Sequence, residues 1–174
     1  MLKRYPRIQY RPADELIESI HPIRKNAPRG WLQGWKKAKL FSKSGISRDV
    51  VIRLSISKSA SVVSSGYGEV RERKYRASRV RVMEIIEVVR WHGGTGVQQA
   101  NRYRWRLGTR RFKEAYTNPQ RYYPTSASRA PEGRTYYRVG GEVLPHAIDL
   151  YPGAVCGPGI HFFRNKTAAV RWPM

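Results

Sequence analysis

The chain has little cysteine. Cys156 is the only one among 174 residues, so no disulfide can form within the chain. A chain that does not depend on disulfides suits a reducing compartment such as the cytoplasm. Its four histidines do not combine with a single cysteine into the ligand pattern of a zinc site. We therefore expect no bound metal and no other cofactor.

Long apolar runs are also missing. No stretch approaches the roughly 20 consecutive apolar residues that a membrane-spanning helix requires. The first residues, MLKRYP, are not followed by the apolar core of a signal peptide. We therefore expect no integral membrane segment. A hydrophobic content of 40% and an aromatic content of 11% still suffice for a packed core, and they favour one globular domain.

Acidic residues are scarce. Twelve Asp and Glu stand against thirty-four Lys and Arg, which leaves a formal net charge of +22 at pH 7. A small soluble domain usually carries a net charge of magnitude about 2–8. A chain with this many uncompensated cations repels itself unless acidic material lies nearby. Nucleic acid, an acidic protein or an anionic membrane would supply this negative charge. The alternative is a basic surface that only increases solubility.

Residues 1–34 are expected to form a basic, proline-rich arm. Prolines recur along it and favour extended chain, while the segment 14–20, DELIESI, has apolar residues at helical spacing and predicts a short helix. The arm either reaches a neighbouring subunit or nucleic acid, or it lies across its own domain. Its candidate contact residues are Arg4, Arg7 and Arg11.

The next segment, residues 30–41, combines amphipathic character with interrupting glycines. Trp31 and Trp35 are four residues apart, which would place them on one face of a helix. A tryptophan pair of this kind usually packs its segment against the core. A platform for stacking nucleic-acid bases is the alternative.

A clear β pattern follows. Residues 51–57 alternate apolar with polar side chains and predict a strand with Ile52, Leu54 and Ile56 inward. Residues 80–89 are rich in β-branched side chains and predict the longest strand. The change of phase at Ile85-Ile86 indicates a bulge or burial on both faces.

Residues 101–123 are the most basic and aromatic part of the chain, inside a segment, 92–132, that we interpret as an insertion. Arginines alternate with aromatic residues at its start, which predicts a strand with one guanidinium face and one apolar face. Guanidinium groups pair with phosphates or carboxylates, and aromatic rings stack on bases or on arginine. We interpret the segment as a contact surface for nucleic acid or an acidic protein; the alternative is an amphipathic strand with solvated arginines. Its candidate contact residues are Arg102, Arg104, Trp105, Arg106, Arg110, Arg111, Lys113 and Arg121.

The end of the chain predicts a compact unit, which follows a linker at residues 124–134. Gly157-Pro158-Gly159 predicts a sharp turn, and Ile160–Phe163 predicts a strand directly after it. Ile160 and Phe162 would share one strand face, with His161 and Phe163 on the other. Asn165 is expected to cap a short helix over residues 166–172.

This unit carries a resemblance to a known family. The pattern in which Gly-Glu-Val precedes Cys156 and then Gly-Ile-His-Phe-Phe resembles a domain of large double-stranded DNA viruses that often follows pentapeptide repeats. The stretches Val50–Ile56 and Lys74–Val82 resemble two strands of the same domain. The resemblance covers roughly Trp35–Trp172, interrupted near residues 92–132, and this chain has no pentapeptide repeats. It implies a fold and a viral origin rather than an activity.

A second and fainter resemblance concerns ADP-ribosyltransferases. Arg138 on one strand and His161 within Gly157–Phe162 stand where that family binds NAD. The family's catalytic glutamate lies beyond the following helix, whereas here the only acid after Glu142 is Asp149. A carboxylate to polarise the nicotinamide ribose is therefore missing from its usual place, and we do not expect an enzyme.

Together these observations predict an α+β fold: one compact, mainly antiparallel β domain over residues 35–174, with short helices and the basic arm 1–34 in front. We expect a structural virion component, a minor capsid protein of a large icosahedral double-stranded DNA virus. Its partners would be capsid proteins of the same particle, and its location the virion and, during assembly, the host cytoplasm. The alternatives are a nucleic-acid-binding protein packaged with the genome and a degenerate ADP-ribosyltransferase-like domain.

Overall fold

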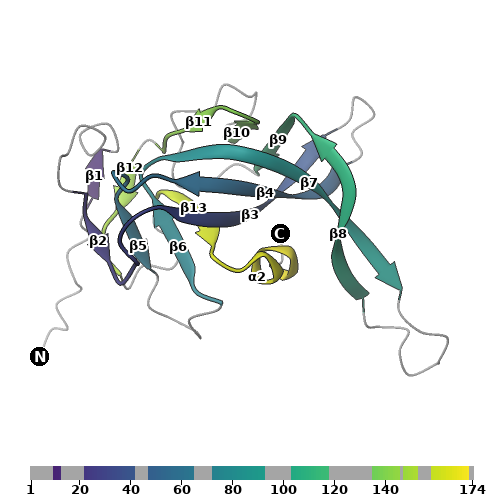
Figure 1. Cartoon of the computed structure of the whole chain (residues 1–174), viewed down its shortest axis with the longest axis horizontal. Helices are drawn as coiled ribbons and strands as arrows, with labels where there is room; N and C mark the ends of the chain where they lie inside the picture. Colours follow the sequence, from purple (N-terminus) through teal and green to yellow (C-terminus); the bar gives the residue numbers. More distant parts are fainter. Residues whose placement is uncertain are drawn as a thin grey trace, which may run out of the picture.

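The computed structural model describes residues 10–12, 22–41, 47–64, 72–92, 103–117, 135–145, 147–152 and 158–172 (Figure 1). Its elements are β1 (Tyr10–Pro12), β2 (Arg24–Lys25), β3 (Leu32–Phe41), β4 (Ser47–Ile56), β5 (Val62–Ser64), β6 (Lys74–Ala77), β7 (Val80–His92), β8 (Tyr103–Phe112), β9 (Glu114–Thr117), β10 (Thr135–Arg138), β11 (Glu142–Val143), β12 (Ala147–Asp149), β13 (Ile160–Phe163) and α2 (Lys166–Arg171).

One large sheet contains most of the strands. Its neighbours run in the order β11-β7-β4-β3-β13-β6-β5-β2, with β8 on β7, and with β9 between β3 and β10. Every pairing in it is antiparallel except the short parallel pair of β2 and β5. Strands β1 and β12 form a separate antiparallel pair, which Figure 1 shows at the end of the molecule away from β8. The expected antiparallel β domain is therefore confirmed.

The main core lies on one face of the long strands β3, β4 and β7. Alternation along β4 buries Ile52, Leu54 and Ile56 completely, as the sequence pattern predicted. Phe162 of β13 and Tyr137 of β10 pack into the same cluster. Fully burying side chains of this size contributes about 1.5–3 kcal/mol each, so this face holds the sheet together.

The opposite face of the same strands has a second, smaller core. Val51 and Val88 are buried there against Val170 of α2. Trp105 and Leu107 of β8 pack onto this cluster from the side. In Figure 1 the helix α2, in yellow, lies beneath β3 and next to β8. Burial of Ile85 in one core and Ile86 on the other face confirms the predicted two-sided burial of β7.

The long strands also close on themselves. β8 follows the edge of β7, and only Lys113 separates β8 from β9. β9 then reaches the edge of β3 that β13 also pairs with, and Lys39 pairs with Tyr116 there. The strands β3, β4, β7 and β8–β9 thus form a ring of hydrogen-bonded neighbours. The segment interpreted as an insertion supplies part of this ring.

The C-terminal unit matches its sequence pattern. All of β13 is buried, with Phe162 in the main core and Phe163 against the ring of Trp172 at a centroid distance of 5.2 Å. The Asn165 side chain accepts a hydrogen bond from the backbone N–H of Thr167 and begins α2. The strand and its capped helix are confirmed.

A buried arginine fixes the chain beside this unit. Arg76 of β6 is 1% exposed, and its guanidinium donates to the carbonyl oxygens of Asp149 at 3.1 Å and Tyr151 at 2.6 Å. Gly159 has a φ of +133°, and a Cβ there would meet the Arg76 side chain at 3.0 Å. Only glycine fits this turn without displacing the arginine.

Some predictions need correction, and others concern residues that the structure does not describe. Residues 32–41 form the strand β3, so the helical interpretation of 30–41 is wrong. Side chains four residues apart share a face in a strand as well as in a helix, and pairing with β4 along the whole of β3 favours the strand. The helices expected of an α+β fold reduce to one among the described residues, the six-residue α2. The predicted helix 14–20 and the linker 124–134 lie outside the described residues. The described part of residues 22–34 pairs into the sheet through β2 and the start of β3.

Candidate functional site

Strand β8 presents different chemistry on its two faces, as the alternating sequence predicted. Trp105 and Leu107 point into the second core and are half-buried. The ammonium nitrogen of Lys37 lies 4.9 Å from the centre of the Trp105 ring, a cation–π contact that fixes the ring. Arg106 lies between them in sequence and is exposed on the other face. Trp105 is therefore an anchor for the strand, and Arg106 is available to a partner.

A bulge then displays the next arginine. Leu107 pairs with Val88 and Arg111 pairs with Ile86, so three residues of β8 stand opposite Glu87 alone. Gly108 makes this possible, because a Cβ there would lie 2.7 Å from both Glu87 Oε2 and Val89 Cγ2. The extra residues leave the ladder and project Arg110 into solvent.

Arg111 holds the bulge in place. Its guanidinium pairs with the Glu84 carboxylate of β7 and donates to the backbone carbonyl of Thr109 at 3.0 Å. Arg53 Nε lies 3.1 Å from the other oxygen of Glu84, without the alignment of a hydrogen bond. The sequence reasoning missed Glu84, since only the pairing of Arg111 with Ile86 brings this acid, two residues along β7, within reach of Arg111. Arg111 therefore contributes more to the shape of the surface than to its free charge.

The remaining cations of this surface have no such partner. Arg106, Arg110 and Lys113 are exposed, and within the described residues they form no ion pair and no side-chain hydrogen bond. We refer to Arg106, Arg110, Arg111 and Lys113 as the β8 basic surface. The backbone of β8 is held by β7 and α2, so only the side chains, and not the strand itself, need to be ordered when a partner binds.

The acid next to Lys113, Glu114, also has a hydrogen-bond partner. Glu114 accepts a hydrogen bond from the hydroxyl group of Tyr136 on β10. This hydrogen bond, with a smaller effect of desolvation, raises the pKa of Tyr136 to about 12. Glu114 therefore stabilises the β9–β10 pair instead of neutralising a β8 cation.

The described surface as a whole is strongly basic. The exposed acids on it are Glu72, Glu114 and Glu142. The exposed cations outnumber them and are Arg29, Arg48, Lys58, Arg81, Arg106, Arg110, Arg111, Lys113, Arg138, Arg164, Lys166 and Arg171.

The other predicted contact residues are placed only in part. Arg104 lies in β8 opposite Trp91, and Arg11 lies in β1 opposite Ile148, but the structure describes neither side chain. The remaining four, Arg4, Arg7, Arg102 and Arg121, lie outside the described residues.

The residues of the ADP-ribosyltransferase resemblance lie on strands that do not pair with each other. Arg138 is exposed at the end of β10, which pairs with β9, whereas His161 is buried in β13 between β3 and β6. The backbone oxygen of His161 accepts a hydrogen bond from Lys36 Nζ at 3.1 Å. Burial, and then repulsion from Lys74, lower the pKa of Lys36 to about 7.

Neither a metal centre nor a membrane helix was found in the described part of the chain. No group of three or more His, Cys, Asp or Glu is arranged there to hold a metal ion. No described helix has the length and apolar composition needed to cross a bilayer. Comparison with protein-family models, with curated proteins and with solved structures finds no match to this chain.

Proposed function

We propose that this protein is a structural component of a large assembly and binds acidic faces of neighbouring protein subunits through the β8 basic surface. The assembly we propose is the capsid of a large icosahedral double-stranded DNA virus, with the protein as a minor capsid component. The virion, and the host cytoplasm during assembly, are its proposed locations. The viral part of the proposal rests on the resemblance of the Gly-Ile-His-Phe-Phe motif and its neighbouring strands.

One observation carries the binding role. Arg106, Arg110 and Lys113 are exposed, and none of them has an ion-pair partner among the described residues. Arg106 and Arg110 belong to β8, which pairs with β7 on both sides of its bulge, and Lys113 directly follows it. Guanidinium groups held in fixed positions bind carboxylates with two parallel hydrogen bonds. Acidic side chains on a neighbouring subunit would provide the charge that the net +22 of this chain lacks.

Fixed acids near the surface favour a protein partner over a nucleic acid. Glu87 packs at the bulge, and Glu114 is exposed beside Lys113. Carboxylates in these positions repel a continuous row of phosphates, whereas a protein surface can match both signs of charge. The overall charge is the observation that favours the second candidate, a nucleic-acid-binding protein packaged with the genome.

Binding to two polyanions tests the proposal. We expect poly-L-glutamate to bind more tightly than a short duplex DNA of equal total charge at the same ionic strength, because its flexible chain can place carboxylates beside the cations and away from Glu87 and Glu114, which a rigid duplex cannot do. Replacing Arg106, Arg110 and Lys113 together by Glu should weaken poly-L-glutamate binding by about tenfold or more, because several charge contacts of roughly 0.5 kcal/mol each are reversed. The matched control replaces Arg29, Lys58 and Arg164 by Glu, which changes the net charge equally at other exposed positions.

Two results would overturn the proposal. Equal losses in the triple variant and in its control would show that the charge acts without a defined site. Tighter binding of duplex DNA, with log affinity falling against log salt at a slope of about −0.9 per phosphate contact, would support the genome-binding candidate instead.

A further inference from the structure

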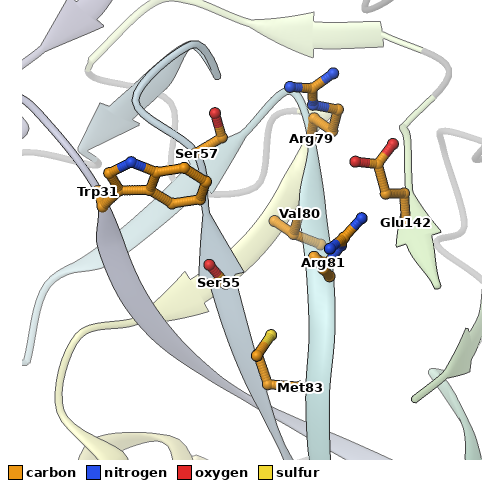
Figure 2. Close-up of a pocket in the computed structure, with 8 residues that line it drawn as sticks. All are labelled: Trp31, Ser55, Ser57, Arg79, Val80, Arg81, Met83 and Glu142. Atoms are coloured by element: carbon orange, nitrogen blue, oxygen red, sulfur yellow. The ribbon is translucent and has the colours of Figure 1, made fainter. Parts of the chain in front are cut away.

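A pocket lies on the half of the sheet that β8 does not reach. It has a volume of about 350 Å³ and is lined by Trp31, Ser55, Ser57, Arg79, Val80, Arg81, Met83 and Glu142. Figure 2 shows Trp31 on one side, Glu142 on the other, Arg79 at one end and Met83 at the opposite end. Trp31 directly precedes β3, Ser55 and Ser57 lie at and just after the end of β4, Arg79 to Met83 lie just before and in the start of β7, and Glu142 begins β11. β8 pairs only from Ile85 of β7 onward, so the two surfaces are separate.

A register shift creates one wall of this pocket. Leu54 of β4 pairs with Val82, but Arg53 pairs with Glu84, so Met83 has no partner across the strands. The bulge keeps Val82 in the main core and turns Met83 outward, where it is 44% exposed. Ser55 pairs with Arg81 on one side and Glu142 pairs with it on the other, and Figure 2 shows the Arg81 side chain between Met83 and Arg79.

Another wall is an exposed tryptophan. Trp31 is 66% exposed, although its large ring would gain free energy from burial. Trp35, on the same side of the strand, packs into the second core, so the two tryptophans have different roles. Exposed tryptophan, methionine and arginine together are the composition that concentrates binding energy at protein interfaces.

The polar groups around the pocket retain binding capacity. Arg79 donates one hydrogen bond to Ser59 Oγ at 3.0 Å. Arg81 and Glu142 line the pocket, and no side-chain hydrogen bond or ion pair joins either of them to a described residue. The pocket thus offers two guanidinium groups, one carboxylate and the hydroxyl of Ser55 around an apolar floor, while the Ser57 hydroxyl is hydrogen-bonded to Ser59.

We propose that this pocket binds a short acidic segment of a partner protein, in which an apolar side chain is flanked by carboxylates. The apolar side chain enters between Trp31 and Met83. A flanking carboxylate pairs with the free guanidinium of Arg81, in the bidentate geometry that arginine favours. Glu142 accepts a backbone N–H of the segment. The volume is at the lower end for a binding pocket, which suits one or two side chains rather than a folded surface.

The hydrogen-bonding groups of the pocket argue for a peptide over a nucleotide chain. A tryptophan and two arginines would also suit a stacked base and its phosphate. Glu142, however, borders the same space and can only accept hydrogen bonds, and a peptide backbone offers it N–H donors whereas a phosphodiester backbone has none. This inference depends on the pocket and not on the β8 basic surface.

Fluorescence anisotropy with short labelled peptides tests the inference. The probe contains Glu-Phe-Glu between glycines, and its comparison peptides contain Gln-Phe-Gln, Glu-Gly-Glu or Lys-Phe-Lys. We expect the Glu-Phe-Glu probe to bind at least about tenfold more tightly than the other three, since it alone combines the apolar side chain with the carboxylates. Trp31→Ala and Arg81→Gln should each weaken its binding about fivefold or more.

Matched variants keep this test separate from the test of the β8 basic surface. Val139→Ala removes another exposed apolar side chain, and Arg106→Gln removes a cation of the β8 basic surface; both should leave probe binding unchanged. Circular dichroism verifies that each variant is folded. Equal binding of Glu-Phe-Glu and Glu-Gly-Glu, or unchanged binding in Trp31→Ala, would overturn the inference. If a single-stranded oligonucleotide displaces the probe and its own binding requires Trp31, the inference is also overturned and the pocket is assigned to nucleic acid.

Discussion

Lys36 is a lysine whose charge conflicts with its surroundings. It points toward the buried strand β13, donates to the backbone oxygen of His161, and lies near a second cation, Lys74. Desolvation and this repulsion lower its pKa to about 7 from 10.5. Between these two pH values the unfolded chain holds a proton that the folded protein has released. The free energy of unfolding therefore rises with pH across this window, and the full cost of the charge is present below pH 7.

Lys36→Met should remove this dependence. We expect the variant to be more stable than the original protein at about pH 6, by roughly 1–3 kcal/mol after allowing for the partial exposure of the side chain. The difference should shrink steadily as the pH approaches 10. Urea unfolding at a series of pH values measures it, with Lys58→Met as the control for removal of an exposed lysine. A difference that does not change with pH would contradict the assignment of the low pKa.

At the scale of a single strand, the bulge in β8 connects backbone geometry to the proposed binding. Gly108 allows Glu87 and Val89 to approach the backbone, and the excursion that follows displays Arg110. A larger side chain at this position must push the strands apart or straighten the bulge. Either change would move the exposed arginine relative to its neighbours.

Gly108→Ala should therefore lower both stability and binding. We expect a loss of about 1–3 kcal/mol in the free energy of unfolding, because the methyl group would lie 2.7 Å from the stiff Val89 side chain. Affinity for poly-L-glutamate should fall with it. Thr109→Ala, an exposed position in the same bulge, is the control and should change neither property much. Normal stability and affinity in Gly108→Ala would show that the bulge has no role in displaying Arg110.

Elements governed by neighbours in sequence were predictable. β13 and its capped helix follow from a glycine-proline turn, an apolar run and Asn165, and all of these act within a few residues. The two faces of β8 around Trp105 follow equally from alternation. The spacing of four residues in 30–41 does not distinguish a helix from a strand. The pairing that makes this segment a strand is with β4, which lies outside the segment.

The sites depend more on register than on local pattern. The pocket brings together three distant parts of the sequence: Trp31, the segment with Arg81 and Met83, and Glu142. They meet because of the pairing registers of β3, β4, β7 and β11. The pairing of Glu84 with Arg111 has the same origin. A single sequence shows which residues are basic or aromatic, but the partner of each cation is decided by long-range strand pairing. The free cations therefore had to be identified from the fold.

At the scale of the whole molecule, charge opposes folding. The net charge of +22 compresses into one domain when the chain folds, and the described acids neutralise few of the surface cations. Self-repulsion of this kind destabilises the compact state relative to the expanded one. An acidic neighbour relieves the repulsion at its contact, which is how an assembly would stabilise this protein. Dissolved salt relieves it as well, without any specific contact.

The melting temperature should consequently rise with ionic strength. From about 0.01 M to about 1 M sodium chloride the screening length falls from about 30 Å to about 3 Å, which removes most repulsion between surface charges. A gain of about 1–2 kcal/mol would raise the melting temperature by roughly 2–8 °C for a chain of this size.

A variant with Arg29, Lys58 and Arg138 replaced by Gln should melt higher at low salt and gain less from added salt, because less repulsion remains to be screened. Poly-L-glutamate at low salt should stabilise the original protein more than sodium chloride of equal charge concentration, since the polymer binds the folded surface as well as screening it. A melting temperature that stays constant or falls with salt would mean that the cations are already compensated within the fold, and the charge argument for an acidic partner would fail with it.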